Sequence, residues 1–386
     1  MTDILSQLII NGKIYIILYI IFLSFLFFDF ECHLNKYRYL TAFFSCVILW
    51  FFLSLRWKTG TDWDSYKELF DTLPLDHLPS LFSVEHFDLG YVFLNAISKA
   101  IWNNYTFFLC IDSFIAILII YLLIRHLSTH PNLSLLIFYA SFFLSHFMGS
   151  NRRMISIGLL LYAFIYTYHR QWFRYSVLQL IALLFHNSAI IGLIGIVIPK
   201  AMIKTKTIIS LWIIGFFLGM IELPKLILEK FTTLFFSSNP LIIKFVYYTE
   251  NQDNESMETI NTPQHFLFAI IKRSLFLVLF IYYIPKIRNQ KYDIAKYLFN
   301  LYFAGILVYM SFNGFAVLQT LSTYFAIIEI FLLAICIPYM TKTVRLLIIP
   351  ILVIYCFMQI LNSLSVYPEA YLPYQSILTF DNYEYK

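Results

Sequence analysis

Charged residues are scarce in this chain of 386 residues. Asp, Glu, Lys and Arg together make up 13% of it, whereas 60% of the residues are hydrophobic; a soluble globular domain carries about 25% charged residues. Glycine and proline are also few, with 11 and 12 residues, so collagen and low-complexity disorder are excluded together with a water-soluble enzyme. The composition therefore predicts a helical membrane protein with several spans, in which 1–386 forms one integral membrane domain.

Cysteine is sparse, and basic charge is not concentrated in any soluble stretch. The five cysteines lie in or beside apolar runs without CxxC spacing, which indicates neither a disulfide framework nor a zinc site. The net charge is +5, but Lys and Arg occur in short loops rather than among aromatic residues of a soluble segment. We therefore expect no nucleic-acid partner, no metal and no other cofactor.

Long apolar runs recur along the whole chain. A helix needs roughly 20 residues to cross a hydrocarbon core of about 30 Å, and it satisfies its own backbone hydrogen bonds there. The sequence thus predicts an all-α transmembrane bundle of about 10–12 spans. The clearest runs are 14–30, 38–55, 105–124, 132–149, 153–168, 206–221, 265–285, 297–312, 321–340 and 344–361.

Basic residues collect on alternate loops, which predicts the orientation. One set carries 14 basic and 3 acidic residues, and the opposite set carries 11 and 17. Cytoplasmic loops favour Lys and Arg, so both termini and the long loops 56–104, 222–264 and 362–386 are predicted to face outward. The basic set is 29–38, 125–131, 169–174, 199–206, 286–296 and 341–345; the other is 1–13, 56–104, 149–153, 222–264, 311–320 and 362–386.

An eleventh apolar run, 173–198, has basic residues at both ends and is too short to span twice. We interpret it as a re-entrant pair of half-helices, or short tilted helices, broken at Phe185-His186-Asn187-Ser188. Such a break places a polar turn at membrane depth, facing a cavity. The alternative is one long tilted helix that locally violates the charge rule.

Two adjacent cations lie inside a predicted span. Lys272 and Arg273 occupy its outer half, where they are suited to bind an anionic headgroup or a pyrophosphate. The alternatives are snorkelling toward the interface or pairing with the intramembrane carboxylates Asp112 and Glu329.

The densest polar segment follows the second span and reads Arg56-Trp57-Lys58-Thr59-Gly60-Thr61-Asp62-Trp63-Asp64-Ser65-Tyr66. Arg56 supplies a cation, Gly60 permits a tight turn, and the Trp63 and Tyr66 rings offer faces for sugars. Asp62 is either a helix N-cap or a reacting carboxylate. Asp62-x-Asp64 resembles the metal-binding DxD of nucleotide-sugar transferases, but the soluble α/β domain that holds that motif is missing, so no metal is expected.

Three further signals are predicted to lie near the outer face. Arg152 and Arg153 open the fifth span, where their guanidinium groups can clamp phosphate oxygens or simply contact headgroups. His186 in the expected break is either a structural residue or a general base or phosphate ligand. Tyr374 belongs to an aromatic outer segment, a type of surface that binds glycans, although interfacial Tyr also anchors membranes.

Four ordered motifs make the chain resemble the EpsG family of Wzy-like polymerases of exopolysaccharide, capsule and O antigen. They are Arg56-x3-Gly60-x-Asp62-Trp63-x2-Tyr66, Arg152-Arg153, Phe185-His186-Asn187-Ser188-Ala189 and Pro373-Tyr374-Gln375-Ser376. The resemblance implies a GT-C-like membrane glycosyltransferase. It would join undecaprenyl-pyrophosphate-linked oligosaccharides on the outer (periplasmic or exterior) face of the bacterial plasma membrane, in contact with membrane lipid. A chain-length regulator is a candidate partner.

The chain departs from the family pattern at two places. The family often has Arg-Gln where this chain has Arg152-Arg153, and it commonly has an Arg before a Tyr-Phe pair near the tenth span. The corresponding segment, 319–325, contains no arginine, which leaves Lys272 or Arg273 as replacements for that phosphate contact. Either Asp62, which we favour, or His186 would be the base. The rival functions are a flippase for the same lipid-linked saccharide and an O-antigen ligase.

Overall fold

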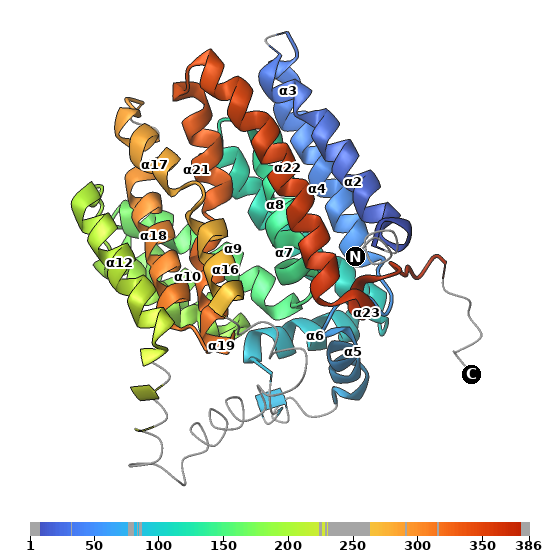
Figure 1. The fold of residues 1–386 in the computed structure, drawn as a ribbon. Helices are drawn as coiled ribbons and strands as arrows, with labels where there is room; N and C mark the ends of the chain where they lie inside the picture. Colours follow the sequence, from blue (N-terminus) through green and yellow to red (C-terminus); the bar gives the residue numbers. More distant parts are fainter. Residues whose placement is uncertain are drawn as a thin grey trace. The chain divides into compact units, whose positions relative to one another are not determined.

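The computed structural model describes residues 8–31, 33–75, 81–82, 84, 87–223, 226–227, 230, 263–289, 292–314 and 316–379. The predicted outer loop 222–264 lies largely outside the described residues. Most of the described chain is helical, and this part contains no β-strand, only one isolated antiparallel bridge between Arg56 and Ser376. The predicted all-α fold with several apolar helices is confirmed (Figure 1).

Contacts divide the chain into two compact units: Met1–Gly192 with Leu333–Lys386, and Leu193–Leu332. The first contains α2 (Lys13–Phe25), α3 (Phe27–Phe30), α4 (Arg38–Ser54), α5 (Trp63–Thr72), α6 (Leu89–Ile101), α7 (Tyr105–Leu127), α8 (Pro131–Phe138), α9 (Asn151–Tyr168), α10 (Trp172–Phe185), α22 (Lys342–Val366) and α23 (Pro368–Tyr371). The second contains α11 (Ile194–Val197), α12 (Thr205–Met220), α16 (Pro263–Ser274), α17 (Leu277–Tyr283), α18 (Ala295–Ser311), α19 (Ala316–Gln319) and α20 (Thr323–Ala326). Helix α21 (Glu329–Cys336) crosses the boundary.

Seven helices among the described residues are long and apolar enough to cross a membrane. Each coincides with a predicted run. The other three runs form α9, α12 and α18, of 18, 16 and 17 residues. Helices α12 and α18 fall short of the roughly 20 residues that a straight span needs, and α9 begins with the polar Asn151-Arg152-Arg153, which lowers its hydropathy.

The run 173–198 is not one long helix. Helix α10 ends at Phe185, His186 is extended with φ −158°, and a 3-10 helix follows at Asn187–Leu193. The Gln179 side chain donates to the carbonyl of Ala189 at 2.7 Å, across the turn. The chain up to Gly192 therefore turns back along α10, and the alternative of a single tilted helix is wrong.

Two short helices of the first unit lie across one end of its long helices. Figure 1 shows α5 and α6 running crosswise to α4, α7 and α22. The ammonium group of Lys99 on α6 donates to the carbonyls of Phe70, Asp71 and Leu73, at 2.7, 2.9 and 3.0 Å, and so satisfies the last turn of α5. This contact fixes α5, and with it the polar segment at its start, against α6.

Candidate active site

The C-terminal segment holds the first motif, residues 56–66, in place. The backbone N–H of Trp57 donates to the carbonyl of Gln375 at 3.0 Å, and that of Ile377 donates to Leu55 at 2.9 Å. Because these bonds join opposite ends of the sequence, the fourth motif acts as a brace for the first.

Tyr374 packs inside this brace. Its ring stacks on Phe52 with centroids 4.1 Å apart, and its hydroxyl donates to the Phe52 carbonyl at 2.8 Å. One ring face and the hydroxyl are thereby used by the fold, while the side chain stays half-buried. The face stacked on Phe52 is not open to a sugar.

Arg56 lies beneath the polar segment and is 2% exposed. One of its terminal nitrogens donates to the carbonyl of Met148 at 2.5 Å, and the other donates to the side-chain oxygen of Asn151. The Asn151 amide in turn donates to the hydroxyl of Tyr91 at 3.4 Å. Arg56 therefore ties the end of α4 to the start of α9, and protein acceptors occupy both terminal nitrogens.

The Met148 carbonyl that accepts from Arg56 lies at the end of a π-helix. Residues Tyr139–Met148 form a π-helix, and the N–H of Gly149 bonds five residues back to Leu144 at 3.2 Å. Segments of π-helix occur mostly as single turns and often lie at functional sites. Here the π-helix ends where Ser150 and Arg152 begin, so it sets the direction in which the second motif enters the site.

Gly60 allows the polar segment to pass close to this π-helix. Its φ is +119°, a conformation that side chains other than glycine rarely adopt. A Cβ at this position would lie 2.5 Å from the carbonyl oxygen of Met148, which is itself fixed by Arg56. Glycine is required here for two independent reasons.

Gly60→Ala should therefore destabilise the protein by about 1–3 kcal/mol from backbone strain alone, with the clash against Met148 adding to it. Thermal unfolding of the purified protein in detergent measures the change. Lys67→Ala is the control, because its surface ion pair with Asp71 is worth only about 0–1 kcal/mol. Equal melting temperatures for Gly60→Ala and wild type would contradict the assignment.

Asp62 stands at the N-cap position of α5, yet its side chain makes no capping hydrogen bond. An Asp in this position normally stabilises its helix by about 1 kcal/mol. Instead, its carboxylate accepts the hydroxyl of Tyr66 at 3.2 Å, and that hydroxyl lies 3.3 Å from Oγ of Ser150. The helix-cap interpretation of Asp62 is wrong, and the carboxylate points into the site.

Tyr66 stays a hydrogen-bond donor in this arrangement. Burial raises the pKa of Tyr66, and the negative charge of Asp62 raises it further, so the hydroxyl keeps its proton at neutral pH. The Tyr66 and Trp63 side chains are 2% and 4% exposed and belong to an aromatic cluster with Tyr91 and Phe70. Neither ring has a free face, which corrects the prediction that both stack on sugars.

Arg152 and Arg153 lie at the first turn of α9, beside this cluster. The guanidinium of Arg152 forms an ion pair with Asp88 at 2.9 Å and lies over the rings of Phe87 and Tyr66, at 5.0 and 5.8 Å from their centroids. It carries five N–H donors, more than one carboxylate accepts. Arg153 makes no hydrogen bond or ion pair with any described residue, and its charge acts on His186.

His186 occupies the break after α10. Its Nδ1 accepts the backbone N–H of Ser188 at 3.2 Å and lies 2.6 Å from the Ser188 hydroxyl. Because Nδ1 is an acceptor, the proton of the neutral ring is on Nε2, which is then a donor.

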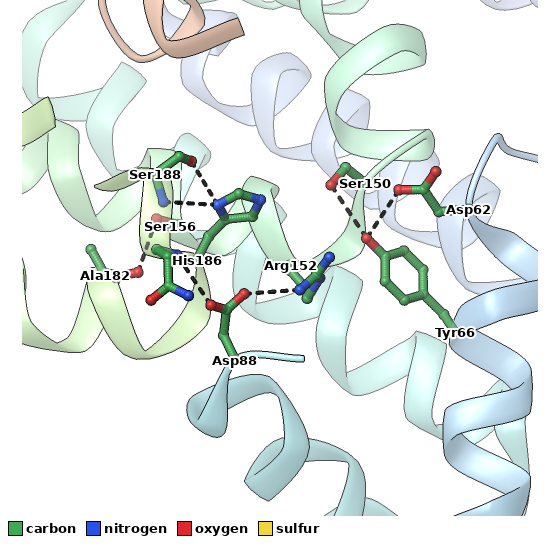
Figure 2. Close-up of polar contacts among 10 residues, drawn as sticks. Asp62, Tyr66, Asp88, Ser150, Arg152, Ser156, Ala182, His186 and Ser188 are labelled. Carbon is green, nitrogen blue, oxygen red and sulfur yellow. Dashed lines mark hydrogen bonds and ion pairs between the residues drawn. The ribbon is translucent and has the colours of Figure 1, made fainter. Parts of the chain in front are cut away.

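Asp88 was not found from the sequence. One of its oxygens accepts Arg152, and the other accepts the backbone N–H of Asn187 at 3.2 Å. Figure 2 shows the resulting arrangement, in which Asp62, Tyr66 and Ser150 meet beside Arg152, and Asp88 joins Arg152 to the break at 186–188. Three motifs that are far apart in the sequence thus form one chain of contacts.

Lys272 and Arg273 belong to the second unit, at the end of α16. The guanidinium of Arg273 lies 3.4 Å from the centroid of the Tyr309 ring and donates to the Ala269 carbonyl at 3.3 Å. The Tyr302 hydroxyl donates to the Arg273 carbonyl at 2.6 Å. Arg273 is thus integrated into the packing of its own unit.

Within the described ranges, no group of three or more His, Cys, Asp and Glu side chains comes together. Asp64, the second carboxylate of the DxD-like pattern, is exposed on α5 rather than directed toward Asp62's partners.

The fold and the site define a multi-pass helical membrane protein with two arginines, two carboxylates and a histidine gathered at the end of one helix bundle. The model of the EpsG family matches residues 39–376, and the chain belongs to this family. The family is associated with glycosyltransferase-like polymerases and places the protein among exopolysaccharide-related membrane enzymes. No curated protein and no solved structure matched the chain.

Proposed function

We propose that this protein polymerises oligosaccharide repeat units carried on undecaprenyl pyrophosphate, building O antigen, capsule or exopolysaccharide on the outer face of the bacterial plasma membrane. One observation carries the proposal: the three motifs that hold Asp62, Arg152 and His186 lie in one connected set of contacts, in which Asp88 links Arg152 to Asn187, the residue after His186. A carboxylate next to preorganised cations is the combination that a glycosyl transfer with a diphosphate leaving group requires.

The arginines stabilise the leaving group. When the glycosidic carbon is attacked, its bond to the lipid diphosphate breaks, and the diphosphate departs with the bonding electrons. Arg152 and Arg153 supply fixed positive charge and fork-shaped donors for those oxygens, in a site where such charge is worth more than in water. They fill the role that a metal ion fills in other transferases.

Asp62 is the general base. The acceptor hydroxyl of the next repeat unit must lose its proton as it attacks, and Asp62 is the carboxylate that is not committed to an ion pair. Its hydrogen bond from Tyr66 fixes its orientation while leaving its second oxygen, Oδ1, for the acceptor. Tyr66 is thus a positioning residue, as are Arg56, Gly60, Trp63 and Tyr374, which shape the segment that carries Asp62.

His186 serves as a donor rather than as the base. Since Nδ1 accepts from Ser188, the Nε2–H group is available to donate to a diphosphate oxygen or to a sugar hydroxyl. Burial lowers the pKa of His186, and the positive charges of Arg153 and Arg152 lower it further, so the ring stays neutral. These contacts support Asp62, rather than His186, as the base.

His186→Gln should lower polymerisation about tenfold, because the glutamine amide retains an N–H donor but loses the fixed ring, and one hydrogen bond to a charged group is worth about 1.5–3 kcal/mol. The rate of polymer formation by purified protein measures this. His169→Gln, a change at an exposed histidine after α9, should have no effect. A loss as complete as that of an Asp62 variant would instead make His186 the base.

The function itself is tested with purified protein in detergent and chemically defined lipid-linked repeat units. Formation of ladders of two or more repeats, with release of lipid diphosphate, is the expected result. A flippase needs a sealed compartment and would leave the repeats unjoined, and a ligase would join them only when a lipid A core is supplied. Either of those outcomes would replace the proposal.

A further inference from the structure

Asp88 has no place in the chemistry described so far, yet it is almost completely buried among charged and polar groups. Its side chain is 5% exposed, and that of its partner Arg152 is 21% exposed. A buried carboxylate is costly unless its oxygens are satisfied, and here both oxygens accept, one from Arg152 and one from the N–H of Asn187. The carboxylate connects the start of α9 to the break after α10.

These contacts replace the hydrogen bond that an aspartate at a helix N-cap normally makes to its own helix. Asp88 is the N-cap residue of α6, and its backbone carbonyl accepts the N–H groups of Tyr91 and Val92 at 3.0 and 3.1 Å. Its side chain makes no capping bond to α6. The Asp88 carboxylate therefore binds Arg152 and Asn187 instead of capping α6.

The position of Asp88 is enforced by close helix packing. Gly90, two residues further on, lies against the last turn of α10, where a Cβ would meet the carbonyl oxygen of Leu184 at 2.9 Å. Helix α6 therefore cannot move away from the break without losing this contact. The aspartate is carried on a rigid element that already touches the segment it binds.

We propose that Asp88 is a positioning residue, which orients the Arg152 guanidinium and holds the segment 186–188 beside it, so that both face one diphosphate. This inference rests on the proposed function for the identity of the anion. Asp88 itself touches no substrate and acts through Arg152.

The charge of Asp88 makes the inference sharply testable. A carboxylate near a diphosphate repels it, so by charge alone Asp88→Asn would bind an anion more tightly. If Asp88 positions Arg152, the Asp88→Asn substitution should instead weaken anion binding. In the asparagine variant, one side-chain oxygen can satisfy only one of the two donors, and the amide N–H₂ opposes the other. Arg152 then loses its fixed orientation.

The experiment measures the dissociation constant of farnesyl diphosphate, a soluble lipid diphosphate, for the full-length protein in detergent by calorimetry. Asp88→Asn should weaken binding at least tenfold, whereas Asp71→Asn, which alters an exposed ion pair with Lys67 on α5, should not change it. In an Arg152→Ala background, Asp88→Asn should cause no further loss, because its effect passes through the arginine.

Three results would overturn the inference: binding that is unchanged or tighter in Asp88→Asn, a loss of the same size with Arg152 already removed, or a wild-type protein that binds no farnesyl diphosphate.

If Asp88→Asn does not yield folded protein, Asp88→Glu takes its place. Its longer arm keeps the charge but displaces the guanidinium, so a severalfold loss that depends on Arg152 is expected. A wild type that binds the diphosphate with this coupling but forms no polymer would refute the proposed function and leave the role of Asp88 standing.

Discussion

Asp62→Asn is expected to abolish polymer formation while leaving the protein in the membrane. The amide has the shape of the carboxylate and still accepts the Tyr66 hydroxyl through its oxygen, so the local fold is preserved. It cannot take a proton from the acceptor hydroxyl, and general base catalysis contributes about 10²–10⁴-fold to such reactions. Gel analysis of surface polysaccharide should show carriers or cores with single repeats only.

The control for this variant lies two residues away. Asp64→Asn makes the same chemical change on the exposed face of α5, and it should leave the polymer length distribution unchanged. Long chains from Asp62→Asn at wild-type protein levels would exclude Asp62 as the base, and equal loss from both variants would point to a general charge effect of the segment.

Arg152→Ala is expected to reduce polymerisation by about 10²–10³-fold, the effect of removing one preorganised stabiliser of developing negative charge. The substitution also leaves the buried Asp88 without its ion-pair partner, which costs stability. Membrane levels must therefore be measured beside the polymer, by immunoblotting and by size-exclusion chromatography of the extracted protein.

Arg152→Lys separates the two effects. Lysine retains a charge for Asp88 but lacks the planar fork that binds two phosphate oxygens at once, so we expect a stable protein that remains strongly impaired. Arg174→Ala removes an exposed guanidinium at the start of α10 and should leave activity intact. A fully active Arg152→Lys would show that point charge suffices and that the fork geometry is irrelevant.

Helix locations were largely predictable because hydrophobic burial and lipid exposure both select long apolar runs. Seven predicted runs coincide with long apolar helices. The turn at His186 was also visible, because His-Asn-Ser interrupts an apolar run with side chains that compete for backbone hydrogen bonds. Helix lengths were less predictable, since hydropathy alone does not show that α12 and α18 are shorter than the roughly 20 residues of a straight span.

Side-chain environments were less predictable. Trp63, Tyr66 and Tyr374 have the composition of a sugar-binding surface, but the helices α5 and α6 fold over the bundle and bury the first two, and the third is half-buried with its ring stacked on Phe52. An aromatic residue serves a core and a glycan surface equally well, so only the tertiary contacts distinguish the two uses.

The role of Asp88 could not be predicted from the sequence, for a different reason. It lies in the acidic segment between two long apolar helices, and nothing in its neighbourhood marks it apart from the helix start that follows. Its partners, Arg152 and Asn187, lie on two other elements. A pair of residues so distant in sequence can be recognised only when the packing of α6 against α10 is known.

The most direct test of the account is an electron cryo-microscopy map of the full-length protein with a lipid-linked diphosphate bound. The account predicts diphosphate density at hydrogen-bonding distance, about 2.7–2.9 Å, from the guanidinium groups of Arg152 and Arg153, with the reducing-end sugar facing Asp62. Diphosphate density at a place that none of these three side chains touches would contradict it.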